Sequence, residues 1–342
     1  MEAIILAGGF GTRLRPLTYT RAKALLPILN KPMITYLIES LPNEVDKVIL
    51  AVNYRKDQIE NYFKKNSFGK EIIVNDEPKP LGTGGAVKFA EKHITAPFLV
   101  LNADVICSLS LDEMIRFHKK NNAVSTISLW PIKNVSEFGV VDIQKDGNVV
   151  DFVEKPKPED APSDLINAGA YFLEYDVLDY IEKGRLVSME KEIFPQIIND
   201  TGKFFGFEFK GYWIDVGRIR SYIDVHMFLL KKQNIEYFTG DNCKIHGRLT
   251  NSSIGDNVLL GEDSHIISSI VFNNAIIGKN VSLTNCVVGE NSKISDHSIL
   301  TNTVVGDNEV VEQNTALENT VVWNQPIPEG YPKKQIGNVI GE

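Results

Sequence analysis

The chain has 342 residues, of which 43% are hydrophobic and 23% are charged, a composition typical of a globular protein large enough for two domains. Its formal net charge of -8 argues against nucleic acid or an anionic membrane surface as the main partner. The three cysteines are too few and too scattered for a disulfide framework or a zinc site, and no apolar run is long enough for a signal peptide or a membrane span. We therefore expect a cytoplasmic protein.

Residues 1–235 alternate short apolar runs with amphipathic stretches, a pattern typical of an α/β fold. In chain order, the pattern predicts strands at 3–7, 48–52, 72–74, 98–101 and 125–129, and helices at 32–41, 58–64, after residue 83 through 91, and 111–119. Strands at 140–143 and 149–152 then flank an Asp-Gly turn, which is a hairpin signal. We expect a Rossmann-like mixed sheet with helices on both faces and an antiparallel lid beside it.

A regular repeat begins after Gly240 and defines a second predicted domain, residues 236–342. Aliphatic residues recur in steps of 6, 6 and 5, at positions 254, 260, 266, 271, 277, 283, 288, 294, 300, 305 and 311. Glycine follows the aliphatic residue at 255, 261, 278, 289 and 306. This 17-residue period predicts a parallel β-helix of about four to five coils with glycine at the corners.

The first predicted strand runs directly into a glycine-rich loop, Gly-Gly-Phe-Gly-Thr-Arg, at 8–13. Glycines let backbone N–H groups approach phosphate oxygens without a Cβ in the way. A dinucleotide-binding Gly-x-Gly-x-x-Gly turn is excluded because Leu14 stands where the last glycine belongs, and a Walker A loop is excluded because no Gly-Lys-Ser/Thr follows. The remaining pattern, a glycine loop with Arg13 and Lys23, suits a transferring phosphoryl group.

Five motifs in register resemble the sugar-1-phosphate nucleotidyltransferase family, and the resemblance covers nearly the whole chain. They are LAGGFGTRLRPLT at 6–18, KALLP at 23–27 with NKPM at 30–33, PLGTGGA at 80–86, FVEKP at 152–156 and GYWIDVG at 211–217. Within the family, VLNADVIC at 100–107 and MEKEIFP at 189–195 are most similar to the GDP-mannose pyrophosphorylase branch. That branch ends in a left-handed β-helix, so the resemblance predicts a left-handed coil here.

The resemblance implies an enzyme that makes an NDP-sugar and pyrophosphate from an NTP and a sugar 1-phosphate. It also implies Mg²⁺ as cofactor and a homo-oligomer assembled through the β-helix. The expected catalytic residues are Arg13, Lys23, Asp104 and Asp215. The expected nucleotide-binding residues are Leu6, Ala7, Gly8, Gly9, Gly11, Thr12, Glu77, Pro80, Gly82 and Thr83.

Asp104 and Asp215 are the candidate metal ligands. Asp104 closes the strand at 98–101 and Asp215 follows a predicted strand at 212–214. Two carboxylates at strand ends can converge on one Mg²⁺, which takes a few carboxylates together with phosphate oxygens. The resemblance implies the same pair. Taken singly, either aspartate could instead be a helix cap or a turn residue.

Residues after the hairpin are candidates for the sugar phosphate. Glu154 can accept hydrogen bonds from sugar hydroxyls, and Lys155 can hold the phosphate as a point charge, although a surface salt bridge is the alternative. The resemblance also places Asn167, Gly169 and Gly139 against the hexose. No side chain in the sequence distinguishes mannose from glucose.

Glu77 is the candidate that reads the base. In the uracil- and thymine-using branches of the family, a glutamine typically stands at this position before a proline. A carboxylate only accepts hydrogen bonds, and guanine presents two adjacent donors, N1–H and N2–H₂. The sequence therefore favours GTP, unless Glu77 is a solvated loop residue.

Three alternatives stay open. The enzyme could use UTP or dTTP with glucose 1-phosphate, or the chain could be a non-catalytic relative that binds nucleotide sugars. Such a relative is expected to lose the cation or the metal carboxylates, which are all present here. The third alternative adds acyl transfer on the β-helix, but His246, His265 and His297 have no supporting constellation in the sequence.

Overall fold

The computed structural model describes residues 1–332 and divides into two compact units. The first unit combines Met1–Gly9 with Tyr36–Ile214, and the second combines Phe10–Thr35 with the chain from Asp215 onward. The chain therefore enters the second unit twice, once just after the first strand and once for the repeat.

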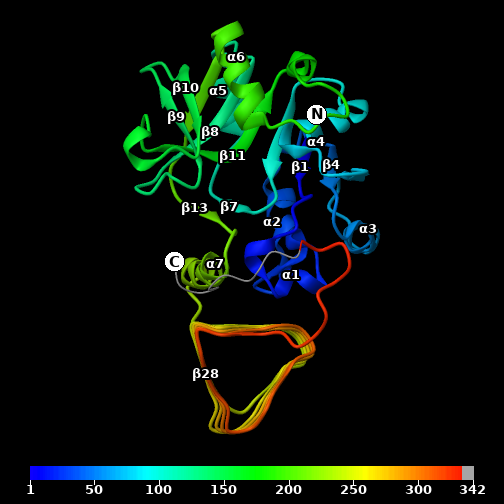
Figure 1. Cartoon of the computed structure of the whole chain (residues 1–342), viewed down its shortest axis with the longest axis vertical. Helices are drawn as coiled ribbons and strands as arrows, with labels where there is room; N and C mark the ends of the chain where they lie inside the picture. The colour runs from blue at the N-terminus through cyan, green and yellow to red at the C-terminus, as the bar shows by residue number, and fades with distance from the viewer. Residues whose placement is uncertain (333–342) are drawn as a thin grey trace. The chain divides into compact units, whose positions relative to one another are not determined.

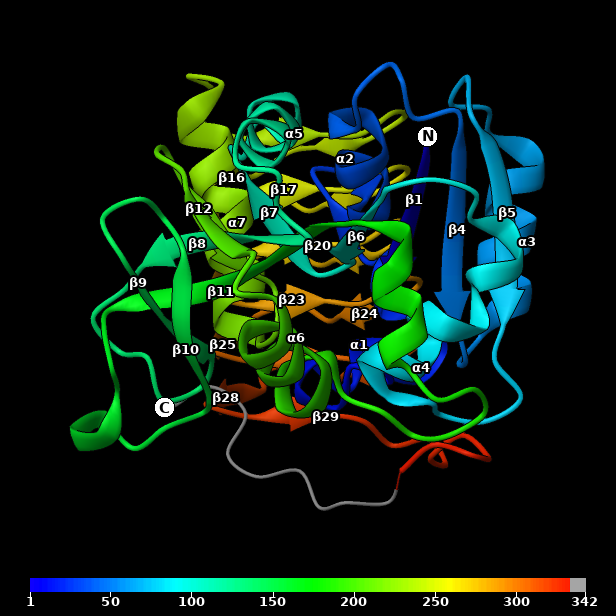
Figure 2. The same cartoon turned by 90° about the horizontal axis from the view of Figure 1, so that it is seen from above.

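A nine-stranded mixed sheet forms the first unit, with the strand order β10-β9-β11-β6-β1-β4-β5 and with β8 and β12 joined beside β11. Its strands are β1 (Glu2–Leu6), β4 (Lys47–Val52), β5 (Glu71–Asp76), β6 (Phe98–Asn102), β8 (Ser125–Pro131), β9 (Gly139–Ile143), β10 (Val149–Glu154), β11 (Leu165–Leu173) and β12 (Phe204–Glu208). The four strands β6, β1, β4 and β5 are parallel, and β1, β4 and β5 lie side by side in Figure 2. The predicted hairpin β9–β10 continues this sheet through β11 instead of forming a separate lid, because Val140 pairs with Ile166.

The helices of residues 1–332 include all the predicted ones, to within a few residues, and also α1, α6 and α7, which were not predicted. They are α1 (Leu17–Thr20), α2 (Met33–Ser40), α3 (Lys56–Lys65), α4 (Gly82–Phe89), α5 (Leu111–Lys120), α6 (Phe194–Thr201) and α7 (Ile219–Lys232), with short turns η1 (Thr12–Leu14), η2 (Lys23–Leu25), η3 (Glu91–His93), η4 (Pro158–Asp160), η5 (Tyr175–Tyr180) and the π-helical η6 (Met189–Ile193). Across residues 1–332, none of them has the length and apolar character needed to cross a bilayer.

Helices cover both faces of the sheet, as the alternation along β8 shows. Ile127 and Leu129 belong to the main apolar core together with Phe194 of α6. Thr126 and Ser128 point the opposite way, because successive side chains of a strand alternate between faces. On that opposite face the hydroxyl of Thr126 lies 2.8 Å from Nδ1 of His118 in α5. The helices α5 and α6 therefore pack on opposite faces.

The repeat in the second unit folds into a left-handed parallel β-helix with three flat faces, whose triangular coils are visible in Figure 1. The first face holds β14 (Phe238–Thr239), β17 (Ser253–Ile254), β20 (Ile270–Val271), β23 (Val287–Val288), β26 (Val304–Val305) and β29 (Val321–Val322). The second holds β15 (Lys244–Ile245), β18 (Leu259–Leu260), β21 (Ile276–Ile277), β24 (Lys293–Ile294) and β27 (Val310–Val311). The third holds β16 (Arg248–Thr250), β19 (His265–Ile267), β22 (Ser282–Thr284), β25 (Ile299–Thr301) and β28 (Ala316–Glu318). All eleven predicted aliphatic positions from 254 to 311 are buried in one core, which confirms the period.

Glycine stands at corners of the coils as predicted, directly after strands of the first and second faces, while the left-handed backbone of most corners is taken by an asparagine. Asn257, Asn274, Asn291 and Asn308 have φ between 57° and 60°, and their amides form a ladder between successive coils at 3.0–3.1 Å. Asparagine tolerates this conformation better than other side-chain residues. The repeat glycines have another cause. A Cβ on Gly261 would lie 2.5 Å from the carbonyl oxygen of the next coil, so glycine permits close stacking.

Candidate active site

The carboxyl ends of the parallel strands form the edge from which the glycine loop begins. Leu6 ends β1 and pairs with Ala51 of β4 and Asn102 of β6. The N–H of Ala7 donates to the Ala51 carbonyl at 2.9 Å, and the N–H of Ala103 donates to the Leu6 carbonyl at 3.2 Å. In open α/β sheets, ligands bind outside this edge of the strands. The predicted nucleotide residues Leu6 and Ala7 are therefore fixed at the usual ligand-binding edge.

Gly8 and Gly9 leave the sheet at this edge, and packing does not require a glycine at position 9. A Cβ on Gly9 would meet no atom within 4 Å, and on Gly8 it would make only ordinary contacts, the nearest at 3.5 Å to the backbone nitrogen of Asn53. The main chain of Gly9 is exposed. A phosphate group can therefore approach this backbone directly, and glycine favours such an approach because it has no Cβ.

Glu77 follows β5 at the same edge, and it is buried. Its N–H donates to the Val52 carbonyl at 2.9 Å, and its carboxylate accepts the N–H of Leu81 at 3.3 Å. Its side chain is 7% exposed, and this burial raises the pKa of the carboxyl group to about 7, with a smaller contribution from the charge of Asp76. The burial excludes the alternative of a solvated loop residue.

The glycines at the start of α4 have a packing role. Gly82 has a φ of +75°, and a Cβ there would lie 2.5 Å from the carbonyl oxygen of Val187. The N–H groups of Gly84 and Gly85 donate to the same carbonyl at 2.9 and 3.2 Å. These contacts explain Gly82 without a nucleotide, whereas Pro80 before it is exposed.

Glu154 ends β10 opposite Gly139 of β9, and the position of its side chain requires a glycine at 139. A Cβ on Gly139 would lie 2.5 Å from the ring of Phe152 and 2.9 Å from the Glu154 carboxylate, so glycine leaves room for both side chains. Burial, and next the charge of Glu190, raise the pKa of Glu154. Lys155 lies 3.6 Å away but is 61% exposed, against 17% for Glu154, so the pair is partly open to solvent.

Asn167 and Gly169 are joined to this acidic region through Tyr171. The Asn167 side chain donates to the Tyr171 hydroxyl at 2.8 Å and accepts the N–H of Gly169 at 3.0 Å. Gly169 has a φ of +83°, and a Cβ there would lie 2.8 Å from the amide nitrogen of Asn102. Burial, and next the charge of Glu190, raise the pKa of Tyr171 well above its usual range, and Glu154 and Asp104 add to the effect. The structure thus brings together Asp104, Glu154, Asn167 and Gly169.

Glu190 is a member of this site that the sequence reasoning missed as a site residue. Its carboxylate accepts hydrogen bonds from the hydroxyls of Thr83 and Ser188, each at 2.7 Å. The Thr83 hydroxyl also accepts the N–H of Met189, so it links α4 to η6. The sequence signal that could have identified Glu190 was its place between the apolar residues Met189 and Ile193, both of which are buried in the structure.

The second unit contains the predicted cations. Gly11 has a φ of +64° and packs against Thr18 and Lys23, with a hypothetical Cβ 2.8 Å from the Thr18 methyl and 3.2 Å from the Lys23 Cβ. Thr12 and Arg13 follow in η1. A Cβ on Gly217 would lie 2.6 Å from the Asp215 carboxylate and 3.2 Å from the Arg13 guanidinium. The structure therefore brings Arg13 and Asp215 together over Gly217.

The two candidate metal ligands flank a small sheet. Asp104 directly precedes β7 (Val105–Cys107), and β7 pairs with β13 (Trp213–Asp215). Asp215 is the last residue of β13, whereas the prediction placed it just after a strand at 212–214. Within residues 1–332 no group of three or more His, Cys, Asp or Glu side chains could hold a metal ion. Mg²⁺ takes a few carboxylates together with phosphate oxygens, so Asp104 and Asp215 are each of the ligand type that it accepts.

Comparison with known proteins identifies the family. The profile of the nucleotidyl transferase family matches residues 2–232. The chain belongs to this family. A second profile, the GMPPB C-terminal domain, matches residues 237–336. The chain is therefore a nucleotidyltransferase whose catalytic sequence is followed by a β-helix, and enzymes of this family generally use a divalent metal ion.

Two curated relatives of this nucleotidyltransferase have the same activity in their names. The probable mannose-1-phosphate guanylyltransferase 2 of Oryza sativa is 39% identical over 279 residues, which cover 77% of this chain and 75% of the relative. The mannose-1-phosphate guanyltransferase of Yarrowia lipolytica is 40% identical over 260 residues, covering 71% and 70%. Among solved structures, HddC from Yersinia pseudotuberculosis complexed with GMP-PN aligns with a TM-score of 0.56 and 30% identity, covering 67% of this chain and 99% of HddC.

Proposed function

We propose that this nucleotidyltransferase makes GDP-mannose and pyrophosphate from GTP and mannose 1-phosphate. The names of the relatives from Oryza sativa and Yarrowia lipolytica support this substrate pair. The observation that carries the choice of base is the buried carboxylate of Glu77 at the ligand-binding edge of the sheet. An ionised carboxylate is an acceptor only, so it matches the N1–H and N2–H₂ donors of guanine and opposes the O4 acceptor of uracil or thymine.

The reaction is an in-line displacement at the α-phosphorus. A phosphate oxygen of the sugar 1-phosphate forms the new P–O bond, while the bond from the α-phosphorus to the bridging oxygen breaks. The electron pair of that bond leaves with pyrophosphate. The nucleophile is already an anion at neutral pH, so no general base is needed, and catalysis depends on positioning and charge neutralisation.

We assign the triphosphate to the glycine loop and its cations. The backbone N–H groups of Gly8, Gly9 and Gly11 would hold phosphate oxygens, Lys23 would fix them, and Arg13 would neutralise the leaving pyrophosphate. Asp104 and Asp215 would hold Mg²⁺. When bound, Mg²⁺ supplies positive charge that offsets the negative charge of the phosphates.

We assign the sugar phosphate to the acidic region around Tyr171. Glu154 would accept hydrogen bonds from sugar hydroxyls, Asn167 would offer its amide, and the backbone of Gly139 and Gly169 would permit close approach. Lys155, the most exposed of the set, would pair with the sugar phosphate. The choice of mannose over glucose rests on the names of the relatives alone.

A matrix of substrates tests the proposal. Pyrophosphate release is measured with four NTPs against mannose 1-phosphate, glucose 1-phosphate and their N-acetylamino relatives. We expect the highest kcat/KM with GTP and mannose 1-phosphate. A clear preference for UTP or dTTP with glucose 1-phosphate would establish the alternative enzyme. Binding of nucleotide sugars without turnover of any pair would establish the non-catalytic alternative.

The remaining expectations have separate tests. Assembly through the β-helix is measured by light scattering, and a cytoplasmic location by cell fractionation. Acyl transfer on the β-helix is tested by acetyl-CoA binding, and we expect none, because His246, His265 and His297 are all exposed.

A further inference from the structure

One edge of the β-helix is chemically unlike the other two. It is formed by the residue pairs 255–256, 272–273, 289–290, 306–307 and 323–324, which recur every 17 residues and follow the first face. We call it the docking edge. At the next edge, Lys279 pairs with Glu262 on the surface, where both side chains are more than half exposed. On the docking edge, by contrast, the Asp307 side chain is only 5% exposed. A buried carboxylate requires a partner charge.

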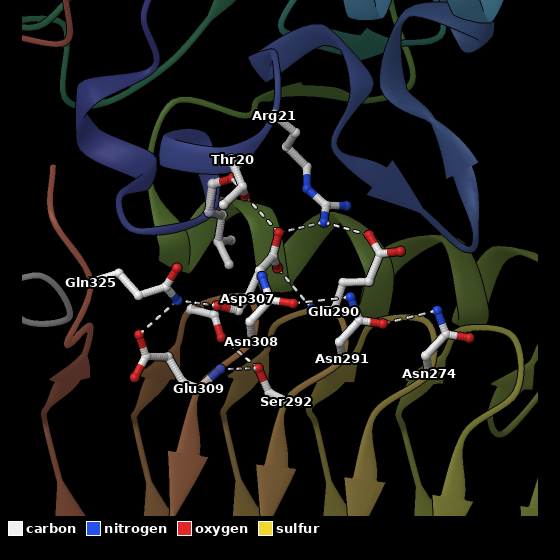
Figure 3. A network of polar contacts seen from close by, with 12 residues as sticks. Thr20, Arg21, Asn274, Glu290, Asn291, Ser292, Asp307, Asn308, Glu309 and Gln325 are labelled. Atoms are coloured by element: carbon white, nitrogen blue, oxygen red, sulfur yellow. Dashed lines mark hydrogen bonds and ion pairs between the residues drawn. The ribbon is translucent and has the colours of Figure 1, made fainter. Parts of the chain in front are cut away.

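That partner is Arg21, which comes from the segment Phe10–Thr35 in the same compact unit. Its guanidinium lies 2.7 Å from the Asp307 carboxylate and 2.8 Å from the Glu290 carboxylate of the preceding coil (Figure 3). The Thr20 hydroxyl donates to the same Asp307 oxygen at 2.6 Å. The guanidinium also stacks on the ring of Phe272, 4.8 Å from its centroid. Arg21 thus contacts three successive coils.

Asp307 is itself fixed by the β-helix. Its second carboxylate oxygen accepts the N–H of Glu290 at 2.7 Å, and its carbonyl accepts the side-chain amide of Gln325 (Figure 3). The rigid coils therefore hold the carboxylate in place before Arg21 reaches it. A preorganised acceptor of this kind loses little entropy when it binds a cation.

Further contacts fasten the segment at both ends of the docking edge. The Asn30 side chain donates to the Asp256 carboxylate at 2.7 Å, two coils before the pair with Glu290. Tyr19 packs against Trp323, with ring centroids 5.0 Å apart. Gly306 permits this packing, since a Cβ there would lie 2.4 Å from the Trp323 ring. The segment is therefore attached along the whole edge.

The segment presents the two cations of the proposed mechanism. Arg21 directly follows the short α1, and Lys23 begins η2 two residues later. Lys23 packs against Gly11, which directly precedes Thr12 and Arg13 in η1. A shift of Arg21 would therefore displace Lys23 and the backbone beside Arg13 together.

We propose that Arg21 and Asp307 are positioning residues for nucleotidyl transfer, and that the docking edge of the β-helix holds Arg13 and Lys23 at the triphosphate. The inference rests on the roles proposed above for Arg13 and Lys23. Because a misplacement of about 1 Å at a reacting group can lower the rate on the order of 100-fold, we expect the loss of either partner to reduce kcat/KM at least about 10-fold.

The test compares Arg21→Met, Asp307→Asn and the double variant in the full-length enzyme. We expect each single variant to lose about 10-fold or more in kcat/KM for GTP. The double variant should lose no more than the larger single loss, because both changes remove one interaction. Arg21→Lys should be intermediate, since it keeps the charge but not the planar fork. The KM for mannose 1-phosphate should change less than about 3-fold, because the proposed sugar residues lie in the first compact unit.

Asp296→Asn is the matched control. Asp296 is also a corner aspartate, and its carboxylate accepts the N–H of Lys279 at 2.9 Å, but the position lies on the next edge. Its kcat/KM should equal that of the wild type.

If Arg21→Met does not fold, Asp307→Asn and Glu290→Gln decide the question, since Glu290 is 36% exposed and tolerates a neutral isostere.

The outcomes separate this inference from the proposed function. A wild-type enzyme that releases no pyrophosphate with any substrate pair overturns the proposed function. An active wild type with folded Arg21 and Asp307 variants of unchanged kcat/KM overturns only the positioning role. Equal losses in Asp296→Asn, or parallel losses in both KM values together with a lowered melting temperature, would also overturn it, because they indicate general weakening of the coil.

Discussion

The buried carboxyl group of Glu77 predicts that the choice of nucleotide depends on pH. Burial raises its pKa to about 7, so the group changes charge within the range where the enzyme can be assayed. Above pH 7 it is an acceptor that suits guanine. Below pH 7 the protonated carboxyl group both donates and accepts, as a glutamine does, and this pattern suits uracil or thymine.

The magnitudes follow from the titration. At pH 6 only about one tenth of a group with a pKa of about 7 is ionised, so kcat/KM for GTP should fall about 10-fold between pH 8 and pH 6. Hydrogen bonds to a charged group contribute about 1.5–3 kcal/mol, so Glu77→Gln should lower kcat/KM for GTP roughly 10- to 100-fold at pH 8. Activity with UTP or dTTP should rise in this variant and should not depend on pH between 6 and 8.

Stability should change in the matching direction. The folded pKa lies above the ordinary value of 4.5, so the folded protein holds this proton more tightly than the unfolded chain. The resulting contribution to the free energy of unfolding is present below pH 4.5 and is lost as pH rises to about 7. Its size is on the order of 3 kcal/mol. Glu77→Gln should therefore gain stability relative to the wild type between pH 5 and pH 8.

The assay is pyrophosphate release with GTP, UTP and dTTP at pH 6, 7 and 8, for the wild type, Glu77→Gln and the control Asp76→Asn. Asp76 is a neighbouring carboxylate that is exposed and pairs with Lys56 on the surface at 2.7 Å, so its removal should leave kcat/KM for GTP at pH 8 nearly unchanged. Because its charge contributes to the raised pKa of Glu77, the GTP profile of this variant should shift slightly toward lower pH. Identical GTP profiles for the wild type and Glu77→Gln would refute the assignment of Glu77 to the base.

Three further predictions concern other parts of the molecule. Arg13→Ala should lower kcat roughly 100- to 1,000-fold in the pyrophosphate-release assay, the effect expected for one preorganised electrostatic contact, and near-normal turnover would reject its role. Glu190→Gln should lower the pKa of Glu154, because it removes a neighbouring negative charge. The KM for mannose 1-phosphate should rise about 10-fold while the KM for GTP stays constant. Equal changes in both KM values would contradict a role of Glu190 near the sugar. Burial lowers the pKa of His226 to about 3, so the unfolded chain takes up a proton at this residue before the folded protein does, and stability should fall as pH drops below about 6.5. His226→Gln should flatten this part of the stability curve measured by thermal unfolding. An unchanged slope would contradict the lowered pKa of His226.

Local sequence patterns predicted most of the fold. The strand that precedes Gly8 and Gly9, the helices α2 to α5 and the eleven aliphatic positions of the β-helix follow from periodicity, because each pattern reports the burial of one face. Local patterns did not reveal two further features. The Asp-Gly turn identified the hairpin but could not show that β9 would pair with β11. The repeat glycines marked the corners, but their pattern could not show that close stacking of adjacent coils is what requires them.

The candidate site was less accessible to sequence reasoning, because its members meet only through tertiary contacts. Glu190 lies in a π-helical turn whose carboxylate is oriented by Thr83 and Ser188. In the sequence Arg21 is one of several cations near the N-terminus, and nothing local distinguishes it from a solvated one. Its partners Glu290 and Asp307 lie more than 260 residues away, so only the folded chain shows that this cation is held in place.

Proteins built from stacked repeats usually gain or lose whole repeats without harm, because each repeat contacts only its neighbours. The attachment of a single-copy segment along the docking edge changes this rule. Arg21 contacts three successive coils through Phe272, Glu290 and Asp307. Asn30 reaches Asp256 of an earlier coil, and Tyr19 packs against Trp323 after the last strand of the first face. Duplication or deletion of one 17-residue coil between Asp256 and Trp323 would leave at least one of these attachments out of register. The segment that docks on this edge thus fixes the number of coils between Asp256 and Trp323, although stacking of the coils alone would accept another number.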